Sequence, residues 1–228
     1  MENKKYERII DLLKTKSCAK QKAYNNAIEQ FAVFKQHLSE YSEKIIKDIG
    51  GANEKIDVYF KDINEFEAEL KFAGDVLIFS LQTNIFHFEP KHEVNQLDYV
   101  KNDPSLGYCA LIQVYNFLGD TVKYNRSQDV GYLIGRIFLN RQNHFFVEGK
   151  RELGFLYNDF DKAEFNSVYM KAIIEATIEY AIDFELYSPP YQDVQLVTYE
   201  EKQFHSINAG MKTGKRLGFQ FNSEDSIS

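Results

Sequence analysis

Apolar residues in the first fifty positions recur at alternating steps of three and four, which is the spacing of one helix face. Tyr6, Ile9, Ile10 and Leu13 form a short stripe. A longer stripe follows, made of Tyr24, Ala27, Phe31, Phe34, Leu38, Tyr41 and Ile45. Gly50-Gly51 is typical of a helix C-terminus. The pattern therefore predicts helix over 4–49, and a break within it would fall at Ser17 and Cys18.

After residue 51, apolar and polar residues alternate one by one, which predicts strands. Apolar and polar positions alternate in residues 56–60 and in residues 66–72. The strand over 66–72 is expected to have one solvent-exposed face. The run VLIFSLQTNIFHFEP favours a hairpin with Gln82-Thr83 as its turn. That register pairs Phe79 with Phe86 and places His87 and Glu89 on the opposite face.

Residues 108–157 predict the middle of an antiparallel sheet. They form two segments rich in β-branched and aromatic residues, with turn formers at Gly119-Asp120 and at Asn140 to Asn143. We interpret each segment as a hairpin. The predicted core is Leu70, Phe79, Phe117, Val122, Phe138 and Phe145.

Beyond the hairpins, Asp161 and Glu164 form a capping box that opens a helix running to about Tyr187. Thr198 and Glu201 open a shorter one, which ends near Gly210. Helices, then about eight strands, then helices indicate an α+β fold. We expect a helical region over 1–50, one α+β domain over 51–210 and a tail over 211–228 that is partly disordered.

Composition narrows the function classes. The net charge is −7 and the pI about 5.3, which makes nucleic acid an unexpected partner. Cys18 and Cys109 lack ligand spacing and are expected to be reduced thiols. The start MENKKYERIIDLLK is not a secretory signal, and no apolar run is long enough to cross a membrane. We expect a cytoplasmic protein with no membrane partner.

Basic and aromatic residues gather in the central hairpins of this acidic chain. A subset is a candidate site for a small anionic ligand, and the other interpretation is solubility and ion pairing at the sheet rim. The expected register places Arg136 and Arg151 on the face opposite Glu148 and Lys150. The candidate ligand-binding residues are Lys123, Tyr124, Arg126, Arg136, Arg141 and Arg151.

A second candidate site is a metal centre. Imidazole and carboxylate groups are transition-metal ligands, and His87, Glu89 and His92 lie within six residues of one another, with Glu93 next to them. Alternation places His87 and Glu89 on one strand face, whereas Pro90 ends the strand. A solvated sheet edge is the alternative interpretation.

The run FFVEGK resembles the second half of the PD-(D/E)xK nuclease motif, with Glu148 as the metal-binding carboxylate and Lys150 near the scissile phosphate. The resemblance covers only these few residues. If Arg141-Gln142 is the turn, Glu148 faces Gly135, where the family's Asp should lie. The nearest upstream Asp is Asp129, about 20 Å away along a straight strand.

The stripe of the long helix is a candidate interface. Phe31, Phe34, Leu38, Tyr41 and Ile45 pack either on the chain's own sheet or on a second subunit or another protein. Taken together, the pattern favours a non-enzymatic binding or regulatory protein without a cofactor, either a small anionic-ligand sensor or a protein-interaction module. The alternatives are a metal-dependent hydrolase or nuclease with its site on the central sheet and a structural subunit of a hetero-complex.

Overall fold

A long helical rod forms the N-terminal part of the chain. The computed structural model describes residues 2–50, 56–127, 129–154, 157–185, 188 and 190–200. Within them α1 (Glu2–Leu12), the π-helical segment η1 (Leu13–Ser17) and α2 (Cys18–Asp48) follow one another without interruption. The predicted helix is confirmed, and at Ser17 and Cys18 the rod continues instead of breaking. Local π geometry absorbs the irregularity there.

The rest of the fold is one antiparallel sheet, so the α+β prediction is confirmed. It has seven strands in the described residues, slightly fewer than expected, and the order is β1-β2-β3-β5-β6-β7 with β4 paired to β5. The strands are β1 (Val58–Asn64), β2 (Glu67–Phe72), β3 (Asp75–Leu81), β4 (Phe86–His87), β5 (Tyr108–Leu118), β6 (Tyr132–Asn140) and β7 (Phe145–Gly149).

The hairpin expected around Gln82-Thr83 is wrong. β3 and β4 do not pair with each other, because both pair with β5 along the same edge. Phe79 lies opposite Val114, and Phe86 lies opposite Cys109. The chain between β3 and β4 therefore bends without reversing.

The first central hairpin is also wrong, whereas the second is confirmed. Residues after Gly119 form the helical turn α4 (Gly119–Lys123), and β5 pairs instead with β6. β6 and β7 do form a hairpin, but Glu148 lies opposite Arg136, one residue from the expected register. Arg136 and Glu148 therefore share a face and form an ion pair.

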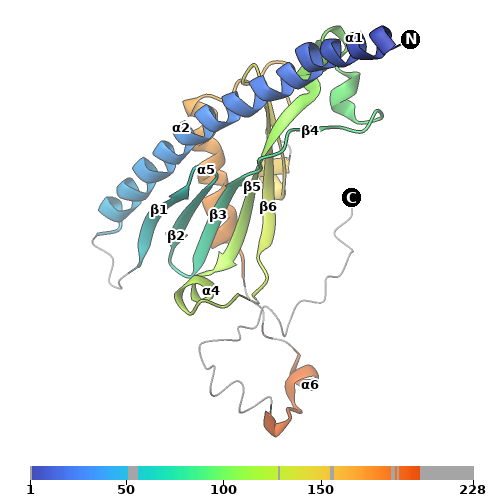
Figure 1. Ribbon diagram of the computed structural model, residues 1–228. Coiled ribbons are helices and arrows are strands. Elements are labelled where there is room, and N and C mark those ends of the chain that lie inside the picture. Colours follow the sequence, from blue (N-terminus) through green and yellow to red (C-terminus); the bar gives the residue numbers. More distant parts are fainter. Residues whose placement is uncertain are drawn as a thin grey trace.

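One face of the sheet is covered by α2 and by α5 (Ser167–Ile182); Figure 1 shows α5 behind the strands. Phe31, Phe34 and Leu38 are fully buried in this core. The ring centroid of Phe34 lies 5.4 Å from that of Phe79 in β3 and 5.9 Å from that of Phe165. Tyr41 and Ile45 pack against the same core and are partly buried. The helix stripe thus lies on the chain's own sheet, so its centre is not open to a second subunit.

Within the described part of the chain, the other face is covered at one end only. The connection from β4 to β5 holds η2 (Glu93–Gln96), α3 (Asp98–Asn102) and η3 (Pro104–Gly107), and it packs a second apolar cluster on the sheet. Phe138 stacks on Phe146 there, with their ring centroids 4.8 Å apart. Of the predicted core, Leu70, Phe79, Phe138 and Phe145 are buried. Phe117 is half-buried and Val122 is 38% exposed, because the uncovered part of the sheet and α4 lie there.

The C-terminal helix α5 starts later than predicted. Asn166, not Asp161, is its N-cap, and its side chain accepts hydrogen bonds from the amides of Val168 and Tyr169. Glu164 forms an isolated bridge to His144 and is not part of a capping box. The remaining described elements are η4 (Arg151–Gly154) and α6 (Tyr191–Val194). The tail over 211–228 and most of the helix expected near 198–210 lie outside the described residues.

Candidate functional site: a pocket at the end of the sheet

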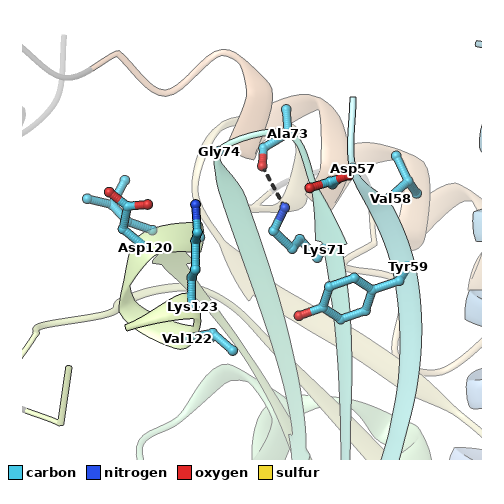
Figure 2. Close-up of a pocket in the computed structure, with 11 residues that line it drawn as sticks. Asp57, Val58, Tyr59, Lys71, Ala73, Gly74, Asp120, Val122 and Lys123 are labelled. Atoms are coloured by element: carbon cyan, nitrogen blue, oxygen red, sulfur yellow. Dashed lines mark hydrogen bonds between the residues drawn. The ribbon is translucent and has the colours of Figure 1, made fainter. Parts of the chain in front are cut away.

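A cavity of about 690 Å³ lies where the start of β1, the β2–β3 turn and α4 meet (Figure 2). We call it the sheet-end pocket. Its volume falls in the range of small-molecule sites. It lies beside the uncovered part of the sheet, and its wall includes Val58, Tyr59 and Leu118.

Backbone contacts hold the three segments of the pocket together. The Gly119 amide donates to the Gly74 carbonyl at 2.6 Å, and the Ala73 amide donates to the Asp57 carbonyl at 3.0 Å. A Cβ on Gly119 would lie 3.2 Å from the Gly74 oxygen, so a side chain at this position would make a tight contact with the β2–β3 turn. Ala73 has a positive φ of 49°, which makes the β2–β3 turn tight. The pocket is therefore built on ordered backbone.

Two ammonium groups lie in this pocket. Lys71 donates to the carbonyl of Ala73 at 3.1 Å, and Lys123 lies over the ring of Tyr124, 5.1 Å from its centroid. In Figure 2 both side chains direct their nitrogen atoms toward the end where Asp57 and Ala73 lie. Neither lysine forms an ion pair with a carboxylate of the described residues. Their charges are thus available to an anionic group.

Tyr59 and two carboxylates complete the polar lining. The Tyr59 hydroxyl donates to Glu69 at 2.5 Å, and burial followed by this hydrogen bond raises the pKa of Tyr59 to about 12. Asp120 lies 3.6 Å from Arg126, which partly neutralises it. Asp57 faces into the pocket beside Lys71 (Figure 2). The mixed lining fits a ligand with an anionic group and a further polar or aromatic part.

The predicted basic cluster does not form one patch. Each arginine has a carboxylate partner: Arg126 with Asp120 and Asp129, Arg136 with Glu148, Arg141 with Asp103, and Arg151 with Asp183. Lys123, Tyr124 and Arg126 lie together, with the Arg126 guanidinium 5.3 Å from the Tyr124 ring centroid. Of the six candidates, only Lys123 lines the sheet-end pocket.

Sequence reasoning missed Tyr59 and Lys71. Both lie at polar positions of alternating strands, which is where any solvated strand face carries such residues. The one local signal is the pair Ala73-Gly74 between two strands, which indicates a tight turn. Gly119 lies beside this turn because β3 pairs with β5. That pairing joins distant parts of the sequence, so no local pattern predicts it.

Two of the three expected metal ligands, His87 and His92, are turned to other partners. The Nδ1 atom of His87 lies 2.8 Å from the Phe88 carbonyl, and Glu89 follows the end of β4. His92 stacks on Phe88, with centroids 4.5 Å apart, and its Nε2 lies 3.9 Å from Glu148. Among the described residues there is no group of three or more His, Cys, Asp or Glu side chains that could hold a metal ion.

The nuclease-like motif lacks its second carboxylate at the expected place. Glu148 is bound by Arg136, on the same sheet face. Asp129 lies in the connection after α4, where it accepts a hydrogen bond from Thr121 at 2.8 Å. The two carboxylates therefore have separate partners.

Comparisons with protein-family models, curated proteins and solved structures found no match to this chain. Within the described residues no helix has both the length and the apolar character needed to cross a membrane. Cys18 and Cys109 are both free thiols. A functional assignment therefore rests on the geometry of the sites.

Proposed function

We propose that this chain is a non-enzymatic binding protein that takes a small anionic ligand in the sheet-end pocket. The observation that carries the proposal is the pair Lys71 and Lys123, two ammonium groups in one cavity without an ion-pair partner among the described residues. Asp57 and Asp120 also line the pocket, but neither forms a described ion pair with these lysines, so a bound carboxylate or phosphate can take their hydrogen bonds.

The other lining groups favour binding over catalysis. Among the described residues that line the pocket there is no histidine, cysteine or serine, so a Ser–His or Cys–His pair is missing. Burial, and then the hydrogen bond to Glu69, raise the pKa of the Tyr59 hydroxyl to about 12, so this group is neutral at physiological pH. Its ring supplies a flat wall, and the backbone-bonded turns provide a site that is already formed before binding.

Calorimetric titration of small carboxylates and phosphates tests the proposal. A ligand that binds the wild type should bind the Lys71→Ala, Lys123→Ala double variant at least about tenfold more weakly, because hydrogen bonds to charged groups contribute about 1.5–3 kcal/mol each. Lys44→Ala with Lys61→Ala is the control, since it removes the same charge outside the pocket. Equal affinity of both double variants would contradict this site.

The metal-dependent enzyme and the structural subunit remain predictions from the sequence. A thermal shift with Mn²⁺, Mg²⁺ or Zn²⁺ that disappears in His92→Ala would favour the enzyme. Co-purification of this chain with one partner in fixed stoichiometry, without any small-molecule binding, would favour the structural subunit.

A further inference from the structure

A second cavity lies at the other end of the sheet, where the rod passes η3. Its volume is about 420 Å³, and residues of η1, the start of α2, η3 and the β6–β7 turn line it. We call it the helix–loop cavity. It shares no lining residue with the sheet-end pocket, so it is a separate site.

The lining of the helix–loop cavity is strongly basic. Lys14, Lys16, Lys22 and Arg141 contribute four cations, and Asp103 is the one carboxylate among the lining residues described. The protein as a whole carries a net charge of −7, so this concentration of positive charge is local. Lys14 comes from η1 and Lys22 from α2, and both line the cavity. Such a cluster repels itself unless an anion is present.

Arg141 is fixed at the floor of this cavity. Its Nη2 donates to Asp103 at 2.6 Å and to the Ser105 hydroxyl at 3.1 Å. Asp103 in turn accepts from the Ser105 amide and hydroxyl, at 3.0 and 2.6 Å. These hydrogen bonds from Ser105, together with Arg141, hold the pKa of Asp103 below its usual value. The guanidinium is thus positioned before any ligand arrives.

Arg141 also has unused donors. Its Nε is buried and has no hydrogen-bond partner among the described residues. A guanidinium carries five N–H donors, and those of Nη2 are directed to Asp103 and Ser105, so the Nη1 group is the one left for a phosphate oxygen. Lys14, Lys16 and Lys22 are exposed and free of ion pairs within the described part of the chain. They can neutralise the remaining phosphate charge.

We propose that the helix–loop cavity binds a small molecule carrying phosphoryl groups, with Arg141 as a positioned cationic donor and Lys14, Lys16 and Lys22 as the neutralising groups. The volume of the cavity suits a ligand of pyrophosphate size or a modestly larger one. This inference goes beyond the proposed function, because its residues and its cavity are different.

Inorganic pyrophosphate is the probe, titrated by calorimetry at two salt concentrations. The wild type should bind it saturably, and Lys14→Ala with Lys22→Ala should weaken binding at least tenfold. Both positions are exposed on the rod, so the variant should fold. The matched control is Lys4→Ala with Lys5→Ala, which removes the same charge from the same rod outside the cavity and should bind as the wild type does. Arg141→Lys keeps the charge but loses the planar guanidinium that Asp103 and Ser105 hold in place, and should also bind more weakly.

Three outcomes would overturn the inference. One is no saturable binding by the wild type, and another is equal weakening in both lysine double variants, which would show general charge attraction. The third is binding to phosphatidylglycerol vesicles with no affinity for pyrophosphate, which would show a lipid surface as the source of the phosphate. The Lys71→Ala, Lys123→Ala variant should bind pyrophosphate in the helix–loop cavity as the wild type does. This variant therefore tests the sheet-end pocket and the helix–loop cavity separately.

Discussion

At the scale of single residues, the arginines show how a cluster of like charges in the sequence is divided in the fold. Arg136 and Arg141 lie five residues apart, yet one pairs with Glu148 across the β6–β7 hairpin and the other with Asp103 from the β4–β5 connection. Both partners come from other segments of the chain. The lysines that remain without carboxylates therefore mark the candidate anion sites, and Arg141 is the one arginine of the cluster that lines either of the two proposed cavities.

Tyr59 gives a pH prediction. The pKa of its hydroxyl is raised from 10.0 to about 12 in the folded protein, by burial first and then by the hydrogen bond to Glu69. The folded state thus keeps a proton that the unfolded chain loses above pH 10. This group stabilises the fold below pH 10, and its contribution is lost as the pH rises from 10 to about 12.

In Tyr59→Phe, the decline of the free energy of unfolding over this alkaline range should be shallower than in the wild type. Urea unfolding at several pH values measures it, and Tyr6→Phe is the control because Tyr6 is 62% exposed. If the free energy of unfolding declines equally with pH in Tyr59→Phe and in the wild type, the pKa of the Tyr59 hydroxyl is not raised in the folded protein.

Residue-level chemistry could be predicted from the sequence only where it is local. The basic cluster was visible, and Lys123 and Arg141 each line a cavity. The pairing of Arg136 with Glu148 was not predicted, because a shift of one residue in register moves a side chain to the other face. Lys14, Lys16 and Lys22 carried no special signal, since lysines on a helix are ordinarily solvated.

At the scale of elements, α2 is the scaffold on which the sheet packs. Its stripe was predicted from spacing alone, and spacing left open whether a sheet or a second chain would cover it. The structure places Phe31, Phe34 and Leu38 in the protein's own core. The helical spacing of this stripe and its burial could be predicted from the sequence. Which surface covers the stripe depends on how strands far along the chain pair.

Phe34→Ala should lower the free energy of unfolding by about 3–5 kcal/mol, because it leaves a cavity between α2, Phe79 of β3 and Phe165. Chemical denaturation measures this, with Gln36→Ala on the exposed side of α2 as the control. The unfolding midpoint should also be independent of protein concentration. A concentration-dependent midpoint would instead indicate that two chains share this stripe.

The start of α5 gives a second prediction at the element scale. Asn166 accepts hydrogen bonds from two amides of the first turn, at 3.0 and 3.2 Å. Asn166→Ala should lower the free energy of unfolding by about 0.5–2 kcal/mol, whereas Asn166→Asp should be close to neutral. The same denaturation measurement applied to Asp161→Ala should show little change. A larger loss of stability in Asp161→Ala than in Asn166→Ala would indicate that the helix begins at Asp161, as the sequence predicts.

At the scale of the whole molecule, the rod extends beyond the body that it supports. In Figure 1 α1 lies past the end of the sheet, and among residues 4–12 no side chain is buried. The apolar side chains of Tyr6, Ile9 and Leu12 are 62%, 53% and 44% exposed. The helix–loop cavity begins just after this segment, at Lys14, so the rod can be shortened in two steps with different consequences.

Deletion of residues 2–12 should change the free energy of unfolding by less than about 1 kcal/mol, since little apolar surface is removed from water there. It should also leave pyrophosphate binding intact. Deletion of 2–22 removes three of the four cavity cations and should abolish pyrophosphate binding, while ligands of the sheet-end pocket bind as before. Thermal unfolding and calorimetry on both shortened proteins measure these outcomes. A large loss of stability on removing 2–12 would instead show that the exposed stripe of α1 packs on another surface. Sedimentation of the wild type would then show whether that surface is a second copy of the chain.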